Sequence, residues 1–225
     1  MRQLESQISL DQPYWKKNYD KCISAIDIIV ELLDVSNGEG VRSAAMCALS
    51  QILTVIKILP EKSSLLQTII NLHSDESMNV SSNAQEMLNP LVEKCSLSQC
   101  IKVLENCIDP ENGMADLGFG HTKLLDRICV EKSEQLSEEG VINQVLPVQV
   151  FAPSLLQQFA SSYTILRKSA SSALVKYKNL VGEESILPFM RESYKNDYRM
   201  SRKMFILLKR QQVCLQTSLF TIAEC

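Results

Sequence analysis

Glycine and proline are scarce in this chain, with seven of each among 225 residues. Sandwiches and barrels depend on tight turns that these residues supply, so their scarcity disfavours both classes. The most apolar stretch, residues 22–33, is interrupted by Asp27 and Glu31, and no run approaches the roughly 18 residues of a membrane-spanning helix. The first ten residues, MRQLESQISL, lack the basic and apolar regions of a signal peptide. We therefore expect a soluble, intracellular protein.

Recognisable catalytic and metal-binding motifs are also missing. There is no phosphate-binding glycine loop, nucleophile elbow or zinc-protease helix. Zinc at Cys95, Cys100 and Cys107 is disfavoured because structural zinc needs four convergent ligands, and neither His73 nor His121 has a second ligand at i+4. The eight cysteines, at positions 22, 47, 95, 100, 107, 129, 214 and 225, mostly lie among apolar residues, which is typical of buried thiols in a reducing compartment. We expect no metal, no cofactor and no enzymatic activity.

Apolar residues instead recur at helical spacing along most of the chain. A first helix ends at the turn residues 36–40, and the pattern predicts further helices over 41–58, 65–72, 78–94 and, after the cap Ser96, 99–108. The paired acids Glu138-Glu139 and Glu183-Glu184 are interpreted as first-turn residues, where they favour the helix dipole. No alternating strand pattern is present. The sequence predicts an all-α protein.

These helices repeat with a period near 40 residues. Residues 41–45 (VRSAA) align with 166–170 (LRKSA) and 80–84 (VSSNA), and the spacing places a further unit at Phe119. A helix pair that cannot bury its apolar stripe alone stacks on its neighbours, as in HEAT-type arrays. The Arg at the start of the second helix is expected to reach the turn of a neighbouring unit. We predict a HEAT-repeat α-solenoid of antiparallel helix pairs over residues 21–210, an N-terminal extension or first helix over 1–20, and a C-terminal helix or tail over 211–225.

Four segments carry a family resemblance: residues 96–104 (SLSQCIKVL), 166–170 continued by 181–184 (VGEE), 202–210 (RKMFILLKR), and 72–75 (LHSD) before the helix that starts near Val80. Together they resemble the last TOG-like domain of the CLASP (CLIP-associating protein) family of microtubule regulators. The resemblance implies a non-catalytic domain that docks adaptor proteins. In the family these adaptors bring the protein to microtubule plus ends, kinetochores and spindle, or cell cortex, where the full protein stabilises microtubules. It also implies a cytoplasmic, cytoskeletal location.

A TOG domain that binds tubulin directly would use the turns inside its helix pairs. The turns at 34–40, 74–79 and 109–118 contain acids, among them Asp34, Asp75 and Asp109, and contain no Lys or Arg. Because tubulin presents an acidic surface, such an edge would weaken binding. Adaptor docking is therefore preferred, with direct tubulin binding and a HEAT scaffold in an enzyme complex, such as a phosphatase, as alternatives.

The charge of the chain is uneven, and its C-terminal quarter is basic. Residues 163–210 hold eleven Lys/Arg against four Asp/Glu, a net charge of +7, whereas residues 1–162 carry −9. A basic helical surface would attract an acidic amphipathic segment of a partner, while the overall acidity and lack of stacking aromatics disfavour nucleic acid. The predicted partner-binding residues are Lys168, Lys176, Lys178, Arg191, Tyr194, Lys195, Tyr198, Arg199, Arg202 and Lys203.

Overall fold

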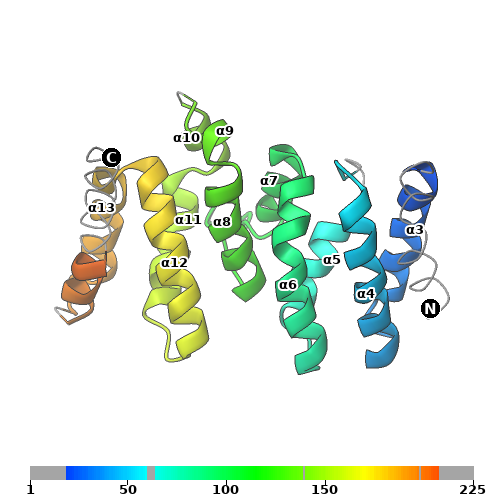
Figure 1. The fold of residues 1–225 in the computed structure, drawn as a ribbon. Helices are drawn as coiled ribbons and strands as arrows, with labels where there is room; N and C mark the ends of the chain where they lie inside the picture. Colours follow the sequence, from blue (N-terminus) through cyan, green and yellow to red (C-terminus); the bar gives the residue numbers. More distant parts are fainter. Residues whose placement is uncertain (1–18, 60–63, 139, 198, 208–225) are drawn as a thin grey trace, which may run out of the picture. The chain divides into compact units, whose positions relative to one another are not determined.

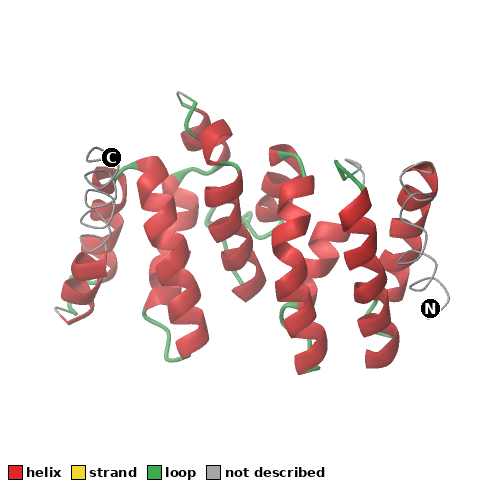
Figure 2. Cartoon of the chain, in the orientation of Figure 1, coloured by secondary structure: helices red, strands yellow, loops and turns green. Residues whose placement is uncertain are grey.

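The computed structural model describes residues 19–59, 64–138, 140–197 and 199–207. Within these ranges the chain consists of helices and turns, with one isolated bridge between Ile108 and Ala115 (Figure 2). The helices are α3 (Tyr19–Leu32), α4 (Glu39–Val55), α5 (Leu65–Leu72), α6 (Met78–Lys94), α7 (Leu97–Glu105), α8 (Phe119–Glu131), α9 (Ser133–Leu136), α10 (Val141–Val145), α11 (Val148–Phe159), α12 (Thr164–Val181) and α13 (Glu183–Ser193) (Figure 1). Residues 199–207 are also helical. The predicted all-α class is confirmed.

Several helix ends lie where the local sequence signals place them. The α5 and α6 bounds match the predicted 65–72 and 78–94. The Ser77 side chain caps α6 by accepting from the Val80 backbone, and Ser96 forms a reciprocal capping box with Gln99 at α7. Helix α4 ends at Val55, three residues before the predicted end, and α7 ends at Glu105 where the pattern predicted Ile108. The starts also differ by two residues, at Glu39 for the predicted 41 and at Leu97 for the predicted 99, because apolar spacing alone does not fix the terminal residue of a helix.

The chain divides into two compact units. Unit 1 comprises residues up to 106 together with 119–124, and unit 2 comprises 107–118 together with the residues from 125 onward. The predicted segments 1–20 and 211–225 fall outside the described residues, apart from the first two residues of α3. The repeat domain over 21–210 stays a prediction.

In unit 1 the helices form the two layers of an α-solenoid. Helix α3 packs against α4, and α5 against α6; between the pairs, α4 contacts α6 and α3 contacts α5. Helix α7 continues the first layer against α5. Buried Leu and Ile side chains, such as Ile29, Leu49 and Ile69, fill the space between the layers. Each pair thus covers the apolar stripe of its neighbour, as the repeat prediction required.

Polar side-chain bonds also join helices of unit 1 that are about 40 residues apart in the sequence. The Asn79 side chain donates to Glu39 across 40 residues (2.8 Å), and the Asn106 side chain donates to Gln67 across 39 residues (2.9 Å). Close packing also governs Gly120, where an added Cβ would lie 2.5 Å from the Ile70 carbonyl oxygen. The second glycine of residues 118–120 therefore permits close approach of α8 to α5.

Unit 2 is built around α11 and α12, with α13 packed against both and α10 against α12. The segment 107–118 is hydrogen-bonded to α11: Ala115 N donates to Val150 O (3.0 Å) and Leu117 N donates to the Ser154 hydroxyl (3.1 Å). Buried Tyr177 donates its hydroxyl to Leu146 O at 2.6 Å. These bonds connect three separate stretches of sequence to one core.

The paired-acid prediction is correct for one pair and wrong for a residue of the other. Glu183 and Glu184 lie in the first turn of α13, after Gly182 with φ of 85°. Glu138 lies in the bend between α9 and α10, outside any helix, and Glu139 is outside the described residues. The error arises because α9 and α10 are too short to show helical periodicity, so the positions of their ends could not be inferred.

Candidate protein-interaction surfaces

The arginine that marks the repeat phase binds the turn that precedes its own helix. In α4, Nη1 of Arg42 donates to the carbonyl oxygens of Val35 and Asn37. In α12, Nη1 of Arg167 donates to the carbonyl oxygens of Ser161 (2.7 Å) and Ser162. The two repeats therefore use the same residue for the same local task, capping orphan turn carbonyls.

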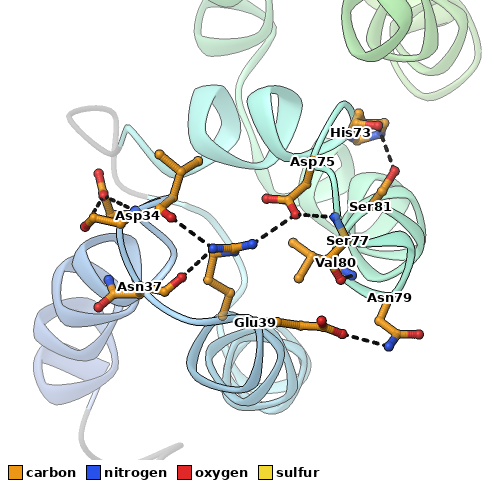
Figure 3. A network of polar contacts seen from close by, with 12 residues as sticks. Asp34, Asn37, Glu39, His73, Asp75, Ser77, Asn79, Val80 and Ser81 are labelled. Atoms are coloured by element: carbon orange, nitrogen blue, oxygen red, sulfur yellow. Dashed lines mark hydrogen bonds and ion pairs between the residues drawn. The ribbon is translucent and has the colours of Figure 1, made fainter.

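Arg42 also reaches the next helix pair, as predicted. Its Nη2 lies 3.0 Å from Oδ1 of Asp75, and only 10% of the Arg42 side chain and 4% of the Asp75 side chain are exposed. Asp75 accepts a further bond from the Ser77 backbone (2.9 Å), as Figure 3 shows for these two labelled residues. The corresponding Nη2 of Arg167 bonds locally to the Thr164 hydroxyl (2.9 Å). The reach to a neighbouring pair is thus confirmed for Arg42 and absent from the described contacts of Arg167.

At the other helix starts the equivalent position carries different residues. Ser81 takes the place of the arginine in α6, and its hydroxyl donates to the His73 carbonyl (2.7 Å) (Figure 3). In α8 the position is Gly120, beside the Ile70 carbonyl. The observed starts, Glu39, Met78, Phe119 and Thr164, lie within two residues of the predicted phase marks. The unit inferred from spacing alone at Phe119 is therefore a helix start, as predicted.

Two acidic side chains accept hydrogen bonds from residues of their own turns, which a count of charges could not predict. Asp34 accepts from the Ser36 hydroxyl (2.6 Å) and backbone (2.8 Å), and these bonds lower the pKa of Asp34. Asp109 likewise accepts from the Glu111 backbone and the Asn112 side chain. With Asp75 paired to Arg42, the negative charge that these turns offer to a partner rests on exposed Asp34, Glu39, Glu76, Glu111 and Asp116, together with half-buried Asp109.

His73 closes α5 in a buried position. Its Nδ1 lies 2.9 Å from the Ile69 carbonyl oxygen, and the Phe119 ring lies 6.1 Å away. Burial lowers the pKa of His73; the Ile69 bond opposes this, and Lys123 and His121 add smaller lowering effects. The side chain is a neutral packing element of unit 1.

Six of the predicted partner-binding residues lie on the surface of unit 2: Lys168, Arg191, Lys195, Arg199, Arg202 and Lys203. Lys195 forms an exposed pair with Glu192 (2.6 Å), and Tyr198 lies outside the described residues. Arg199, Arg202 and Lys203 share one helical stretch at i, i+3 and i+4, so they point to one side of it.

The other three predicted residues do not contribute freely exposed groups. Lys176 donates to Oδ2 of Asp126 at 2.7 Å, and that carboxylate is nearly buried. Lys178 is only 4% exposed. Tyr194 is 6% exposed, donates its hydroxyl to Leu156 O, and has a pKa raised by burial. The predicted surface therefore omits Lys178 and Tyr194, because both side chains turn into the packed core of unit 2.

Sequence reasoning missed exposed apolar side chains close to the predicted cations. Tyr163 is 70% and Ile165 is 59% exposed at the start of α12, five and three residues before Lys168. Phe205 and Ile206 are 45% and 39% exposed in the same stretch as Arg202 and Lys203. Their apolar character made them candidates for core positions. Tyr163 and Ile165 do not fit the helical spacing of the buried residues of α12, and this departure could have indicated that they are exposed.

Metal binding finds no site in the part of the chain that the structure describes: no group of three or more His, Cys, Asp or Glu side chains is placed to hold an ion. Cys95 and Cys100 are buried, and burial raises the pKa of Cys107 to about 11. Across the described ranges, no helix combines the length and apolar character needed to cross a membrane. Among the described cysteines, Cys22, Cys95, Cys100 and Cys129 are buried packing side chains, Cys107 is half-buried and Cys47 is exposed.

No protein-family model matches the chain, and no curated protein is similar to it in sequence. Two similar solved structures are helical. A designed armadillo repeat protein in complex with a (KR)4 peptide is 16% identical, with a TM-score of 0.39, covering 92% of this chain and 96% of its own. An engineered protein is 14% identical, with a TM-score of 0.40, covering 92% of this chain and 95% of its own. Both are products of design, so neither brings a natural partner to this chain.

Proposed function

We propose that this chain is a non-catalytic protein-interaction domain of a CLASP-type microtubule regulator. In this proposal it docks adaptor proteins that bring the full protein to microtubule plus ends, kinetochores and spindle, or cell cortex, where it stabilises microtubules. The cytoplasmic, cytoskeletal location follows from the same proposal. Its support is the ordered resemblance of residues 96–104, 166–170 with 181–184, and 202–210 to that family, together with a helical-repeat fold of the scaffold type.

The observation that carries the docking role is the surface of residues 199–207. Arg199, Arg202 and Lys203 are exposed, and no acidic side chain among the described residues pairs with them. Phe205 and Ile206 add exposed apolar area in the same stretch. A cationic and apolar face of this kind suits an acidic amphipathic helix. The carboxylates of such a helix would pair with the cations, and its apolar side chains would pack on Phe205 and Ile206.

Charge reversal tests this role. Changing Arg199, Arg202 and Lys203 to Glu is expected to weaken capture of plus-end and kinetochore adaptors from a mitotic extract by tenfold or more, since each reversal turns an attraction into a repulsion. All three side chains are exposed, so the circular dichroism spectrum and the unfolding transition are expected to stay close to wild type.

A matched control changes Lys57 and Lys102 to Glu. Both lysines are exposed in unit 1, and each substitution reverses one positive charge, as it does at Arg199 and Arg202. The double reversal of Arg199 and Arg202 is expected to weaken capture more than the double reversal of Lys57 and Lys102. Equal effects would place docking elsewhere. Recovery of phosphatase subunits without plus-end or kinetochore proteins would favour the enzyme-scaffold alternative.

Direct tubulin binding keeps one supporting observation. The turn before α12 exposes Tyr163 and Ile165 near Lys168, an aromatic and basic combination that the turns at 34–40, 74–79 and 109–118 lack. Co-sedimentation of the purified chain with microtubules distinguishes the two functions. Strong pelleting that Tyr163→Ala and Lys168→Glu abolish would replace adaptor docking by tubulin binding.

A further inference from the structure

A groove between α4 and α6 lies within unit 1 and has no part in the function proposed above. It encloses a cavity of about 140 Å³. Its lining residues are spaced i, i+1 and i+4 along α4 and i, i+3 and i+4 along α6. Residues with these spacings share one face of a helix, so one face of each helix forms the groove. The lining residues are Met46, Cys47, Ser50, Asn83, Glu86 and Met87.

Apolar groups form the inner part of this groove. Met46 is 2% exposed and belongs to the floor, while Met87 is half-buried and Cys47 is exposed. Thioether side chains adapt their shape to an incoming group. A cavity of about 150 Å³ accommodates a molecule the size of benzene, so this volume suits a single aliphatic or aromatic side chain.

Polar groups at the rim have unused hydrogen-bonding capacity. Among the described residues, no hydrogen-bond or ion-pair partner exists for the Ser50 hydroxyl, the Asn83 amide or the Glu86 carboxylate. Asn83 can both donate to and accept from a peptide group. The rim is therefore equipped to bind the backbone on either side of an anchored side chain.

The charge of this face is negative. Glu39, Glu86 and Glu93 are exposed on α4 and α6, whereas the one arginine of these helices, Arg42, is buried against Asp75. Lys94 is half-buried at the end of α6, where it stabilises the negative end of the helix dipole. An occupant with positive charge is favoured by this balance.

We propose that the groove between α4 and α6 binds a linear segment of a partner protein, in which one aliphatic anchor is flanked by Lys or Arg. The anchor lies against Met46 and Met87. A flanking cation pairs with Glu86, and Asn83 bonds to the peptide backbone. This second site selects a partner opposite in charge to the acidic adaptor expected at residues 199–207, and it is independent of that function.

Synthetic peptides test the proposal on the full chain. A peptide KKLRK is expected to bind at least tenfold more tightly than EELDE or the anchorless KKGRK, as measured by fluorescence anisotropy. Bound KKLRK is expected to slow the alkylation of exposed Cys47 by at least threefold, which mass spectrometry of the labelled chain reads at that residue.

Two variants locate the charge that selects the peptide. Glu86→Lys is expected to weaken KKLRK binding at least tenfold, because it reverses the charge at the rim. Asp27→Lys makes the same charge change at an exposed position of α3 that does not line the groove. It is expected to weaken KKLRK binding by less than threefold. Circular dichroism of both variants checks that the fold is intact.

Each contrary result overturns the proposal. Absence of binding by KKLRK, equal binding of the three peptides, or equal losses in the two variants would remove the charge and anchor selectivity. Binding that leaves Cys47 alkylation unchanged would place the peptide at another surface. None of these outcomes bears on adaptor capture through Arg199, Arg202 and Lys203, so the two functions fail separately.

Discussion

Arg42 and Asp75 form a nearly buried ion pair, with Nη2 and Oδ1 at 3.0 Å, that joins the first helix pair of unit 1 to the second. The same guanidinium holds two turn carbonyls. One side chain therefore stabilises both the entry to its own helix and the junction with the next pair. A buried charge left without its partner is strongly unfavourable, which makes this junction sensitive to either residue.

Arg42→Ala is expected to lower the free energy of unfolding by about 3 kcal/mol or more, since it leaves the Asp75 carboxylate buried without its cation. Arg167→Ala removes comparable turn bonds without orphaning a buried carboxylate, and is expected to cost about 1–2 kcal/mol. Urea denaturation followed by circular dichroism measures both. Equal losses would show that the ion pair adds nothing beyond the turn bonds.

Gly120→Ala is expected to destabilise the protein by about 1–3 kcal/mol, because the new methyl group would lie 2.5 Å from the Ile70 carbonyl oxygen. Gly40→Ala supplies a matched control. Gly40 is in the first turn of α4 and has no atom within 4 Å of the added position. Its replacement is expected to stabilise by about 0.4–1 kcal/mol through the unfolded state. Shifts of opposite sign in the urea midpoint are the predicted result.

The buried His73 makes stability depend on pH. Its pKa is lower in the folded state, chiefly through burial, than the value near 6.5 in the unfolded chain. Above that value both states are neutral and the residue contributes no pH dependence. As pH falls through about 6.5 the unfolded chain gains a proton that the folded chain resists, so the free energy of unfolding falls.

Comparing wild type with His73→Gln isolates this contribution. Between pH 7 and pH 5 the urea midpoint of the wild type is expected to decrease more than that of the variant. Parallel decreases in the two proteins would assign the pH dependence to other groups.

Alkylation is expected to separate the cysteines by burial. At pH 8, iodoacetamide is expected to modify exposed Cys47 well before Cys22, Cys95, Cys100 and Cys129. Burial also raises the pKa of Cys129 to about 12, so its reactive thiolate is rare at this pH. Mass spectrometry of peptides at increasing reaction times gives the order. Labelling of Cys129 as fast as Cys47 would contradict the packing of unit 2.

Tyr194→Phe examines a residue first assigned to the docking surface. Loss of its hydroxyl leaves the Leu156 carbonyl without that donor and is expected to cost about 1–2 kcal/mol of stability. Because Tyr194 is buried, adaptor capture at a temperature where the variant remains folded is expected to match wild type. A selective loss of capture with stability unchanged would restore Tyr194 to the surface.

Periodicity and capping signals were sufficient to predict the helical pairs and several of their ends, because an apolar stripe and a cap such as Ser96 are local features. The direction of a side chain depends on packing partners that are distant in sequence. Lys178 and Tyr194 carry polar groups typical of surfaces, yet both residues are almost completely buried, and the Tyr194 hydroxyl bonds to the Leu156 carbonyl inside unit 2. Asp75 looked like an exposed turn acid because its partner, Arg42, lies 33 residues away.

The groove between α4 and α6 could not be inferred from the sequence for the same reason. Met46 and Met87 each fit a core position within their own helix, and only the spacing of two packed helices leaves a cavity between them. Residues that line a cavity between two helices have no sequence signature of their own, because the cavity depends on how the helices pack.

The bonds from Asn79 to Glu39 and from Asn106 to Gln67 span 40 and 39 residues, close to the repeat period predicted from the sequence. Loss or duplication of one complete helix pair would keep first-layer helices against first-layer ones, whereas an insertion of half that length would set first-layer helices against second-layer ones. We therefore expect changes in the length of this chain to be tolerated in steps of about one helix pair. Redesign of the chain by shortening would use the same unit of change.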